Sequence, residues 1–190
     1  MTIPQQLHGF ATELDELTLH VQSTFGALSE PHLNWKPSAD KWSIAQCFHH
    51  IITSNTTYFA TFDAVKSGTY SPTLWQRVPF VPVIIGREMV KAIGRVPNQP
   101  IKTSTIFEPS KSTIAREIIS GFALHQKRVV EYLRHFAESD IATEDIIISL
   151  SVSPVLIAPL SDVLTMTVNH AFRHVLQAEK VMNMVNFGIS

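Results

Sequence analysis

The stretch SDVLTMTVNHAFRHVLQAEKVMNMV, residues 161–185, decides the fold class of this chain. Its core-facing positions recur at spacings of three and four residues, which is the period of one face of an α-helix. Two histidines and a glutamine occupy positions in this otherwise largely apolar stripe. We therefore expect a long helix with a polar patch on its buried face, formed by Val163, Thr167, His170, His174, Gln177, Val181 and Val185.

Three further segments show the same helical period, at about residues 3–28, 43–68 and 112–137. The first two begin with capping boxes, Thr2 with Gln5 and Ser43 with Gln46, and Gly68 is a suitable helix end. Four long amphipathic helices predict an all-α protein built as a four-helix bundle.

The connection between the second and third helices, residues 67–111, is long enough to cross the full length of a bundle. These two helices are therefore expected to run parallel, in an up-down-down-up order with a long crossover. A short helix is expected inside the connector at residues 84–93, and the whole chain, residues 1–190, is expected to form a single domain.

Composition narrows the classes of protein. With 15 Lys and Arg against 16 Asp and Glu, the net charge is −1, which argues against a nucleic-acid partner. The single cysteine, Cys47, excludes a disulfide framework. Neither a signal peptide nor an uninterrupted apolar span is evident, so a cytoplasmic protein without a membrane partner is expected.

Two uncharged stretches, at about residues 146–160 and 80–85, are unusually apolar for connecting segments. Residues 146–152 alternate enough to predict a short strand or an apolar flap. A symmetric homodimer would bury both stretches, and the alternative is that they fold back over the bundle.

Histidine is the most unusual component, with nine in the chain. His170 and His174 are one helical turn apart, so two neutral imidazoles can share one metal ion. The alternative is a pair of hydrogen-bonded core histidines. A third ligand is available from His49 or His50 on the second helix, and periodicity alone does not decide between them.

Two motifs, taken in order along the chain, resemble a known family. Residues 34–37, NWKP, precede KWSIAQ at residues 41–46, and His50 follows Trp42 by eight residues. A late helix carries His170, His174 and Gln177 in the order H-x-x-x-H-x-x-Q. This pattern is similar to that of the DinB-like (YfiT-like) superfamily, although Val175 and Leu176 replace the basic residue and glycine often found there.

The resemblance implies a four-helix bundle with His50, His170 and His174 binding one divalent ion, variously nickel, zinc or iron. It further implies a metal-dependent hydrolase, or a transferase acting with a low-molecular-weight thiol, on a small-molecule substrate. The alternative is a non-catalytic, stress-related binding module with a structural or vestigial metal site.

A metal with three neutral ligands and an open position lowers the pKa of a bound water, which is the nucleophile expected here. The helix stripes hold no Asp or Glu that would act as a general base. Candidates for orienting the histidines are Gln177, Asn55 and Ser54, and a core role is equally consistent with Asn55. His125 is a candidate for lining the pocket, but a satisfied core or boundary position is the favoured interpretation for it. Cys47 and Trp42 are expected to pack, with Trp42 also closing one end of the site.

Overall fold

The computed structural model describes residues 1–95, 105–110 and 112–184. Most of these residues are helical, which confirms the all-α class. The long helices are α1 (Ile3–Phe25), α3 (Ile44–Thr56), α6 (Ile118–Glu138) and α7 (Leu160–Met184). Shorter elements connect them, namely α2 (Glu30–Asn34), α4 (Phe59–Lys66), η1 (Trp75–Arg77), α5 (Val81–Ala92), η2 (Thr105–Phe107), β1 (Ile147–Leu150) and β2 (Ser153–Pro159).

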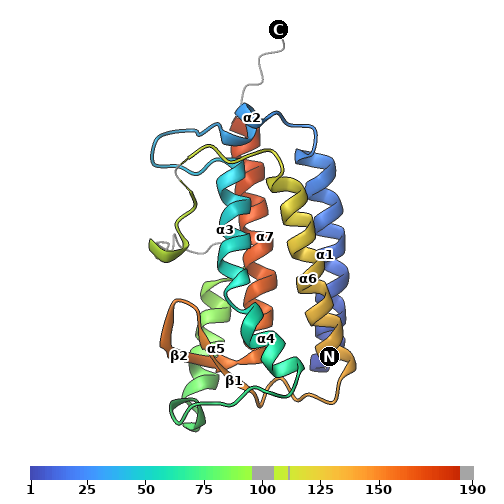
Figure 1. The fold of residues 1–190 in the computed structure, drawn as a ribbon, viewed down its shortest axis with the longest axis vertical. Helices are drawn as coiled ribbons and strands as arrows, with labels where there is room; N and C mark the ends of the chain where they lie inside the picture. Colours follow the sequence, from blue (N-terminus) through green and yellow to red (C-terminus); the bar gives the residue numbers. More distant parts are fainter. Residues whose placement is uncertain (96–104, 111, 185–190) are drawn as a thin grey trace.

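The four long helices lie side by side around one core (Figure 1). Helices α1 and α3 each pack against both α6 and α7. In Figure 1, α1 and α7 run upward whereas α3 and α6 run downward. Their facing stripes are apolar and fully buried, so burial of these side chains is the main stabilising contribution. The largest of them are Phe25, Phe48, Phe122 and Phe136, and Phe62 of α4 is buried with them.

Both predicted capping boxes are present. The Thr2 hydroxyl accepts the Gln5 backbone N–H, and the Gln5 side chain accepts the Thr2 N–H. Ser43 and Gln46 make the same reciprocal pair at the start of α3. The second box fixes the first residue of α3, and therefore the rotation of every later side chain on that helix, His50 included.

The expected single helix over residues 43–68 is wrong, because it is broken into α3 and α4 at residues 57 and 58. The Thr57 hydroxyl donates to the Ser54 carbonyl at 2.5 Å, and the Tyr58 N–H donates to Asn55 instead of Ser54. Side chains that bond to nearby carbonyls compete with regular helical bonding. The predicted end is correct, since Gly68 has a φ of 71°, in the region that favours glycine.

Two other helix boundaries differ from the prediction. Helix α6 begins at Ile118, not near residue 112, because Asn34 holds the Ile114 backbone in a different conformation. The Asn34 side chain accepts the Ile114 N–H at 2.9 Å and donates to the Ile114 carbonyl at 2.8 Å. Helix α1 ends at Phe25 instead of residue 28. The predicted end of the last helix near Val185 lies outside the described residues.

Helix α5 of the connector and the β1–β2 hairpin form a second layer beside α7 (Figure 1). The short helix expected in the connector is α5, and the strand expected after α6 is β1, which pairs antiparallel with β2. Helix α5 packs against β2 and α7. Gly86 permits this contact, because a Cβ there would lie 2.2 Å from the Asp162 Oδ2 atom and 3.0 Å from the Pro159 ring.

Among the described residues, no helix is both long enough and apolar enough to cross a membrane.

Candidate metal centre and its cavity

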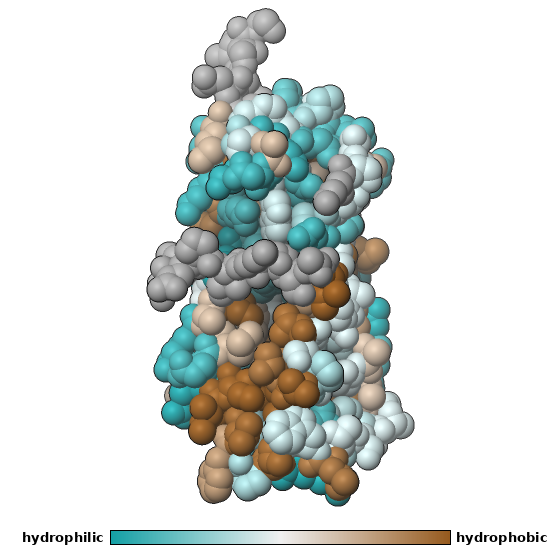
Figure 2. All heavy atoms as spheres, turned by 90° about the vertical axis from the view of Figure 1, so that its left-hand side faces the viewer, coloured by the Kyte–Doolittle hydropathy of each residue, from teal (hydrophilic) through white to brown (hydrophobic). Residues whose placement is uncertain are grey.

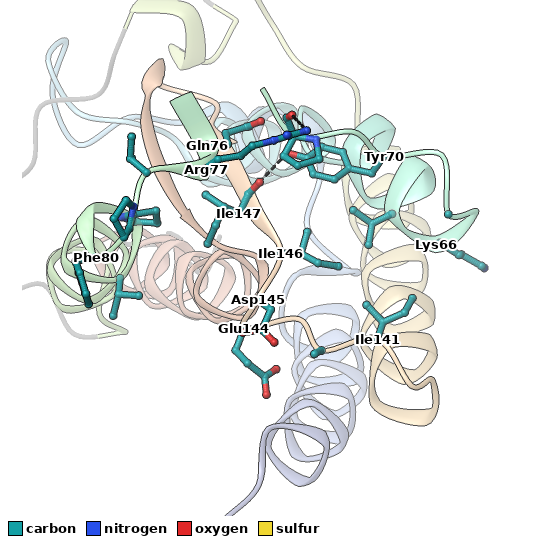
Figure 3. Close-up of a pocket in the computed structure, with 18 of the residues that line it drawn as sticks. Lys66, Tyr70, Gln76, Arg77, Phe80, Ile141, Glu144, Asp145, Ile146 and Ile147 are labelled. Atoms are coloured by element: carbon teal, nitrogen blue, oxygen red, sulfur yellow. Dashed lines mark hydrogen bonds between the residues drawn. The ribbon is translucent and has the colours of Figure 1, made fainter. Parts of the chain in front are cut away.

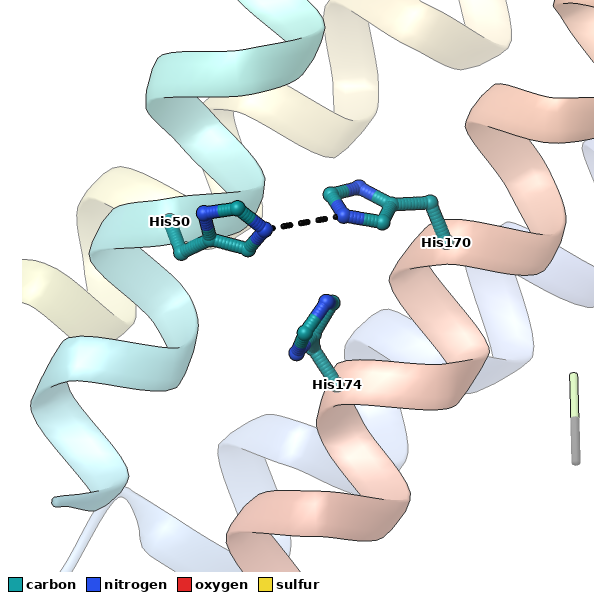
Figure 4. Close-up of side chains that lie close together, drawn as sticks. All are labelled: His50, His170 and His174. Carbon is teal, nitrogen blue, oxygen red and sulfur yellow. Dashed lines mark hydrogen bonds between the residues drawn. The ribbon is translucent and has the colours of Figure 1, made fainter. Parts of the chain in front are cut away.

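Three histidines from two helices meet between α3 and α7 (Figure 4). His50 projects from α3, and His170 and His174 project from consecutive turns of α7. The Nε2 atoms of His50 and His170 are 3.0 Å apart, and one ring nitrogen from each of the three residues lies within 4.8 Å of the others. The structure thus brings together the three residues predicted as ligands.

The structure shows that His50, and not His49, is the histidine of α3 that faces the cluster. His50 is buried and faces α7, whereas His49 is partly exposed and its Nδ1 atom lies 3.4 Å from the Thr53 hydroxyl on its own helix. Neighbouring helix positions point about 100° apart, so the two rings cannot both face α7.

A carbonyl-type oxygen lies beside the Nδ1 atom of each ring. His50 Nδ1 is 2.7 Å from the Phe107 backbone carbonyl, His170 Nδ1 is 3.3 Å from Asn55 Oδ1, and His174 Nδ1 is 2.8 Å from Gln177 Oε1. Because these oxygens only accept, each Nδ1 carries the proton and donates it. In the neutral ring this leaves the lone pair on Nε2, which is the atom a metal would bind.

The distance between the rings of His50 and His170 fits a shared cation. Two Nε2 lone pairs facing each other at 3.0 Å repel unless a positive ion lies between them. Two ligands at about 2.0–2.1 Å from one ion, at angles of 90° to 109°, would have their nitrogens about 2.9–3.4 Å apart. The donor set and its spacing therefore suit a divalent metal of the kind imidazole binds.

Burial keeps all three rings neutral. It lowers the pKa of His50 and, together with the charges of neighbouring groups, lowers that of His174 to about 3. Burial is also the main cause of the lowered pKa of His170, to which the charges of His174, His50 and Arg173 add. Neutral imidazole is the form that binds metals, so the site needs no deprotonation near neutral pH.

Trp42 covers one side of the cluster. Its ring centroid lies 4.8 Å from that of His50 and 5.6 Å from that of His174, on which it stacks at an interplanar angle of 25°. The expectation that Trp42 packs at one end of the site agrees with this position. A large aromatic ring in this place limits water access to the two imidazoles from that side.

The cluster borders a cavity of about 430 Å³. Helix α5 and the β1–β2 hairpin provide its apolar wall, and α3 and α7 provide its polar side. This volume is within the range of small-molecule sites. The lining residues are His50, Ser54, Asn55, Tyr58, Met89, Ala92, Ile93, Phe107, Leu150, Ser151, Val152, Met166, Thr167, His170, Arg173 and His174.

The four residues predicted to orient the histidines or to line the pocket differ in where the structure places them. Asn55 and Gln177 accept from histidine rings, as expected of them. Ser54 lines the cavity, but its hydroxyl donates to the His50 carbonyl at 2.5 Å and does not reach a ring nitrogen. His125 does not line the cavity, because on α6 it stacks against Phe59 with ring centroids 5.1 Å apart. Both of its ring nitrogens are buried without a hydrogen-bond partner.

Two contributors were missed from the sequence. The Phe107 carbonyl belongs to the connector, and no side-chain pattern marks a backbone oxygen as an acceptor. Arg173 lies between the two α7 histidines and was not singled out, because a basic residue on a helix is ordinarily a surface residue.

A second, larger cavity of about 1040 Å³ lies near the α4–α5 connection (Figure 3). Its lining is mixed, with Lys66 and Arg77 on the connector side and Glu144 and Asp145 before β1. None of the predicted site residues lines it.

Fold and cluster together define the class: an all-α protein with a candidate three-histidine metal centre in the wall of a small-molecule cavity. The family follows from comparison with known sequences, in which the DinB superfamily model matches residues 13–178. The chain belongs to this superfamily, as the sequence motifs indicated, and the match includes all three histidines and Gln177. Comparisons with curated proteins and with solved structures found no match.

Proposed function

We propose that His50, His170 and His174 bind one divalent cation, nickel, zinc or iron, through their Nε2 atoms. One observation carries this proposal: three neutral imidazoles converge while a carbonyl oxygen accepts from each Nδ1 atom. Such acceptors fix the tautomer and the ring orientation of metal-binding histidines. Without an ion, the facing lone pairs of His50 and His170 would disfavour this arrangement.

We further propose a catalytic site of the hydrolase or thiol-transferase type, acting on a small molecule. When bound, a divalent cation with three neutral ligands activates a water or a thiol and polarises the substrate. The adjoining cavity leaves one side of the cluster accessible, which supports an open site. The chain's own residues position the reactants, since no Asp or Glu is among the described residues that line the cavity.

Several of these residues are themselves fixed by hydrogen bonds. The Thr167 hydroxyl donates to the Val163 carbonyl at 2.8 Å, which leaves its oxygen lone pairs as acceptors. The Tyr58 hydroxyl accepts the Ser151 N–H at 3.2 Å, which ties the hairpin to the α3–α4 break. We infer that α1, α3, α6 and α7 form an up-down-down-up four-helix bundle with residues 67–111 as its crossover. Phe107, in the described part of this connection, lies beside His50.

Metal content tests the proposal. Protein purified without a tag is expected to hold one equivalent of metal by elemental analysis, and the His170→Ala variant is expected to lose it. His49→Ala is the matched control, because it removes the neighbouring ring that faces away from the cluster, and it should retain the metal. Wild-type protein as metal-poor as His170→Ala would refute the proposal.

The reaction class needs a separate measurement. Metal-loaded protein is screened with ester and amide substrates and with electrophiles in the presence of low-molecular-weight thiols. Turnover that is lost in His170→Ala and kept in His49→Ala supports an enzyme. One bound metal without turnover in either screen favours the alternative, a non-catalytic stress-related module with a structural or vestigial site.

We also propose that two copies associate through the face that carries α5 and the hairpin. Figure 2 shows hydrophobic residues gathered on the lower half of this face. Phe80 is 80% exposed although its φ of 65° is unfavourable for a side chain of its size, which supports a role for the projecting ring. Sedimentation is expected to give a dimer for the wild type and a monomer for Phe80→Ser, and a wild-type monomer would contradict this.

A further inference from the structure

Tyr58 is a residue of the cavity wall whose hydroxyl hydrogen is not used by the protein. It lies at the break between α3 and α4, and it lines the cavity together with Ser151, in the turn of the hairpin. Its hydroxyl oxygen accepts the Ser151 backbone N–H at 3.2 Å. A backbone N–H only donates, so this bond uses an oxygen lone pair and leaves the hydroxyl hydrogen available. Along the described part of the chain, no bond uses that hydrogen.

The other two tyrosines of the chain form hydrogen bonds in the opposite sense. The Tyr70 hydroxyl donates to the Ile147 carbonyl at 2.7 Å, and the Tyr132 hydroxyl donates to Asp63 Oδ1 at 2.6 Å. A tyrosine that is wholly or partly buried usually finds a partner for its hydroxyl group. In Tyr58 the donor is therefore left for a group inside the cavity.

The Tyr58 side chain is held in place at both its ring and its hydroxyl group. The ring stacks on that of Phe62, with centroids 5.8 Å apart and an interplanar angle of 12°. Phe62 is itself fully buried, and the bond from Ser151 holds the hydroxyl oxygen. The donor is thus preorganised, so a ligand that accepts from it causes little further loss of side-chain freedom.

Two other hydroxyl groups of the cavity wall are available only as acceptors. The Ser54 hydroxyl donates to the His50 carbonyl at 2.5 Å, and the Thr167 hydroxyl donates to the Val163 carbonyl at 2.8 Å. Each has a single hydrogen, and each uses it within its own helix. An acceptor on a ligand therefore finds a neutral O–H donor at Tyr58 but not at these two positions.

The remainder of the wall offers mostly apolar surface. Met89 of α5, Leu150 of β1 and Met166 of α7 contribute to it. Arg173, the charged residue of the described lining, is engaged with groups of the protein, one of which is the Ala92 carbonyl at 3.2 Å. A wall of this kind favours a hydrocarbon body with few polar groups, and a neutral donor suits a neutral acceptor.

We propose that the cavity binds small, largely apolar molecules that carry a neutral carbonyl group, and that the Tyr58 hydroxyl donates to the carbonyl oxygen. This inference rests on the proposed function, because it names the ligand class of the same site. It makes Tyr58 a specificity-determining residue, which orients the ligand by one hydrogen bond while Met89 and Met166 contact its hydrocarbon part.

A purely structural role for Tyr58 makes a different prediction. A tyrosine that only ties the hairpin to the α3–α4 break would change stability when replaced. It would not distinguish a carbonyl from a group of the same shape that accepts no hydrogen bond. The test therefore compares acetophenone with α-methylstyrene, in which a CH₂ group replaces the carbonyl oxygen.

Binding is followed by the methyl NMR signals of Met89 and Met166, in metal-free and in zinc-loaded protein. The preference is the ratio of the two dissociation constants, and its comparison between two proteins cancels the difference in ligand hydration. In the metal-free form, Tyr58→Phe is expected to reduce the preference for acetophenone about three- to tenfold, the factor typical of a neutral hydrogen bond.

Tyr70→Phe is the matched control. It also removes a hydroxyl group that is bonded to the hairpin, but Tyr70 does not line this cavity. Its preference for acetophenone should equal that of the wild type, provided that thermal melting shows both variants to be folded. An equal reduction in Tyr70→Phe would overturn the inference, because loosening of the hairpin would then account for the effect.

A second measurement uses the wild type and does not depend on how a variant folds. The infrared C=O stretch of ¹³C-labelled acetophenone bound to metal-free protein is expected at a lower frequency than in an alkane solvent, because an O–H donor weakens the carbonyl bond. In folded Tyr58→Phe the frequency should return toward the alkane value.

The remaining outcomes are also decisive. The inference is overturned if metal-free wild type binds neither ligand, if its preference equals that of Tyr58→Phe, or if the bound carbonyl has the frequency found in alkane. Failure to bind zinc would refute the proposed function alone, because the metal-free measurements would still decide the role of Tyr58.

Discussion

Replacing Gln177 with leucine removes the acceptor of the His174 Nδ1–H without touching a proposed ligand. The bond is 2.8 Å long, and its loss frees the ring to adopt the tautomer with the proton on Nε2. Loss of such an acceptor typically weakens metal binding by about 10- to 100-fold, or roughly 1.4–2.7 kcal/mol. Gln177 is partly exposed, so water can replace part of the bond, and we expect about tenfold, the lower end of that range.

The assay is competition for zinc against a colorimetric chelator at pH 7.5. Gln177→Glu should bind zinc at least as tightly as wild type, because a carboxylate is a stronger acceptor for the ring N–H. The exposed neighbour Leu176 provides the control, and Leu176→Ala should leave the affinity unchanged. If Gln177→Leu and wild type agree within about twofold, well below the range expected for such an acceptor, then Gln177 does not orient His174.

Three other experiments, two of them with substitutions, test features outside the metal cluster. Burial lowers the pKa of His125 to about 4, so the unfolded chain binds the extra proton first as pH falls. His125 should therefore contribute about 3 kcal/mol to the stability that wild type loses between pH 6.5 and 4, beside the contributions of the other buried histidines. By urea denaturation, His125→Leu should lose less than wild type by this amount, and parallel pH profiles would contradict this. Gly86→Ala should cost about 1–3 kcal/mol, because the Asp162 side chain must rotate and α5 must move away from the Pro159 ring, whereas an unchanged melting temperature would show that this contact tolerates a methyl group. Cys47 is fully buried, with a pKa that burial raises, so a thiol reagent should label it only after unfolding; rapid labelling of native protein would refute its core position.

The presence of the four long helices could be predicted from the sequence, because the spacing of hydrophobic residues along a helix is a local property. The stripes around Leu14, Phe48, Phe122 and Val163 are all buried. Boundaries could not be predicted as well, because distant partners set them. Helix α6 begins late because Asn34, 80 residues earlier, bonds both backbone groups of Ile114.

In the candidate site, too, features with a local sequence signal could be predicted, whereas features set by distant residues could not. The spacing of His170 and His174 was enough to place both on one face of α7. The helical periodicity of the segment around His49 and His50 did not show which of these two faces the core. The resemblance to the family indicated His50, and the structure buries that ring against α7. The acceptor from Phe107 depends on how η2 packs against α3, and the sequence around Phe107 carries no local signal of that contact.

Two different parts of the molecule surround the cavity, and this has a consequence for divergence within the superfamily. The three histidines belong to the packed helices α3 and α7, whereas Met89, Ile93, Leu150 and Val152 belong to α5 and the hairpin. Substitutions in this second group reshape the space for a ligand while the ring nitrogens and their acceptors stay in place. Selectivity can therefore change in small evolutionary steps without loss of the metal chemistry proposed for the core.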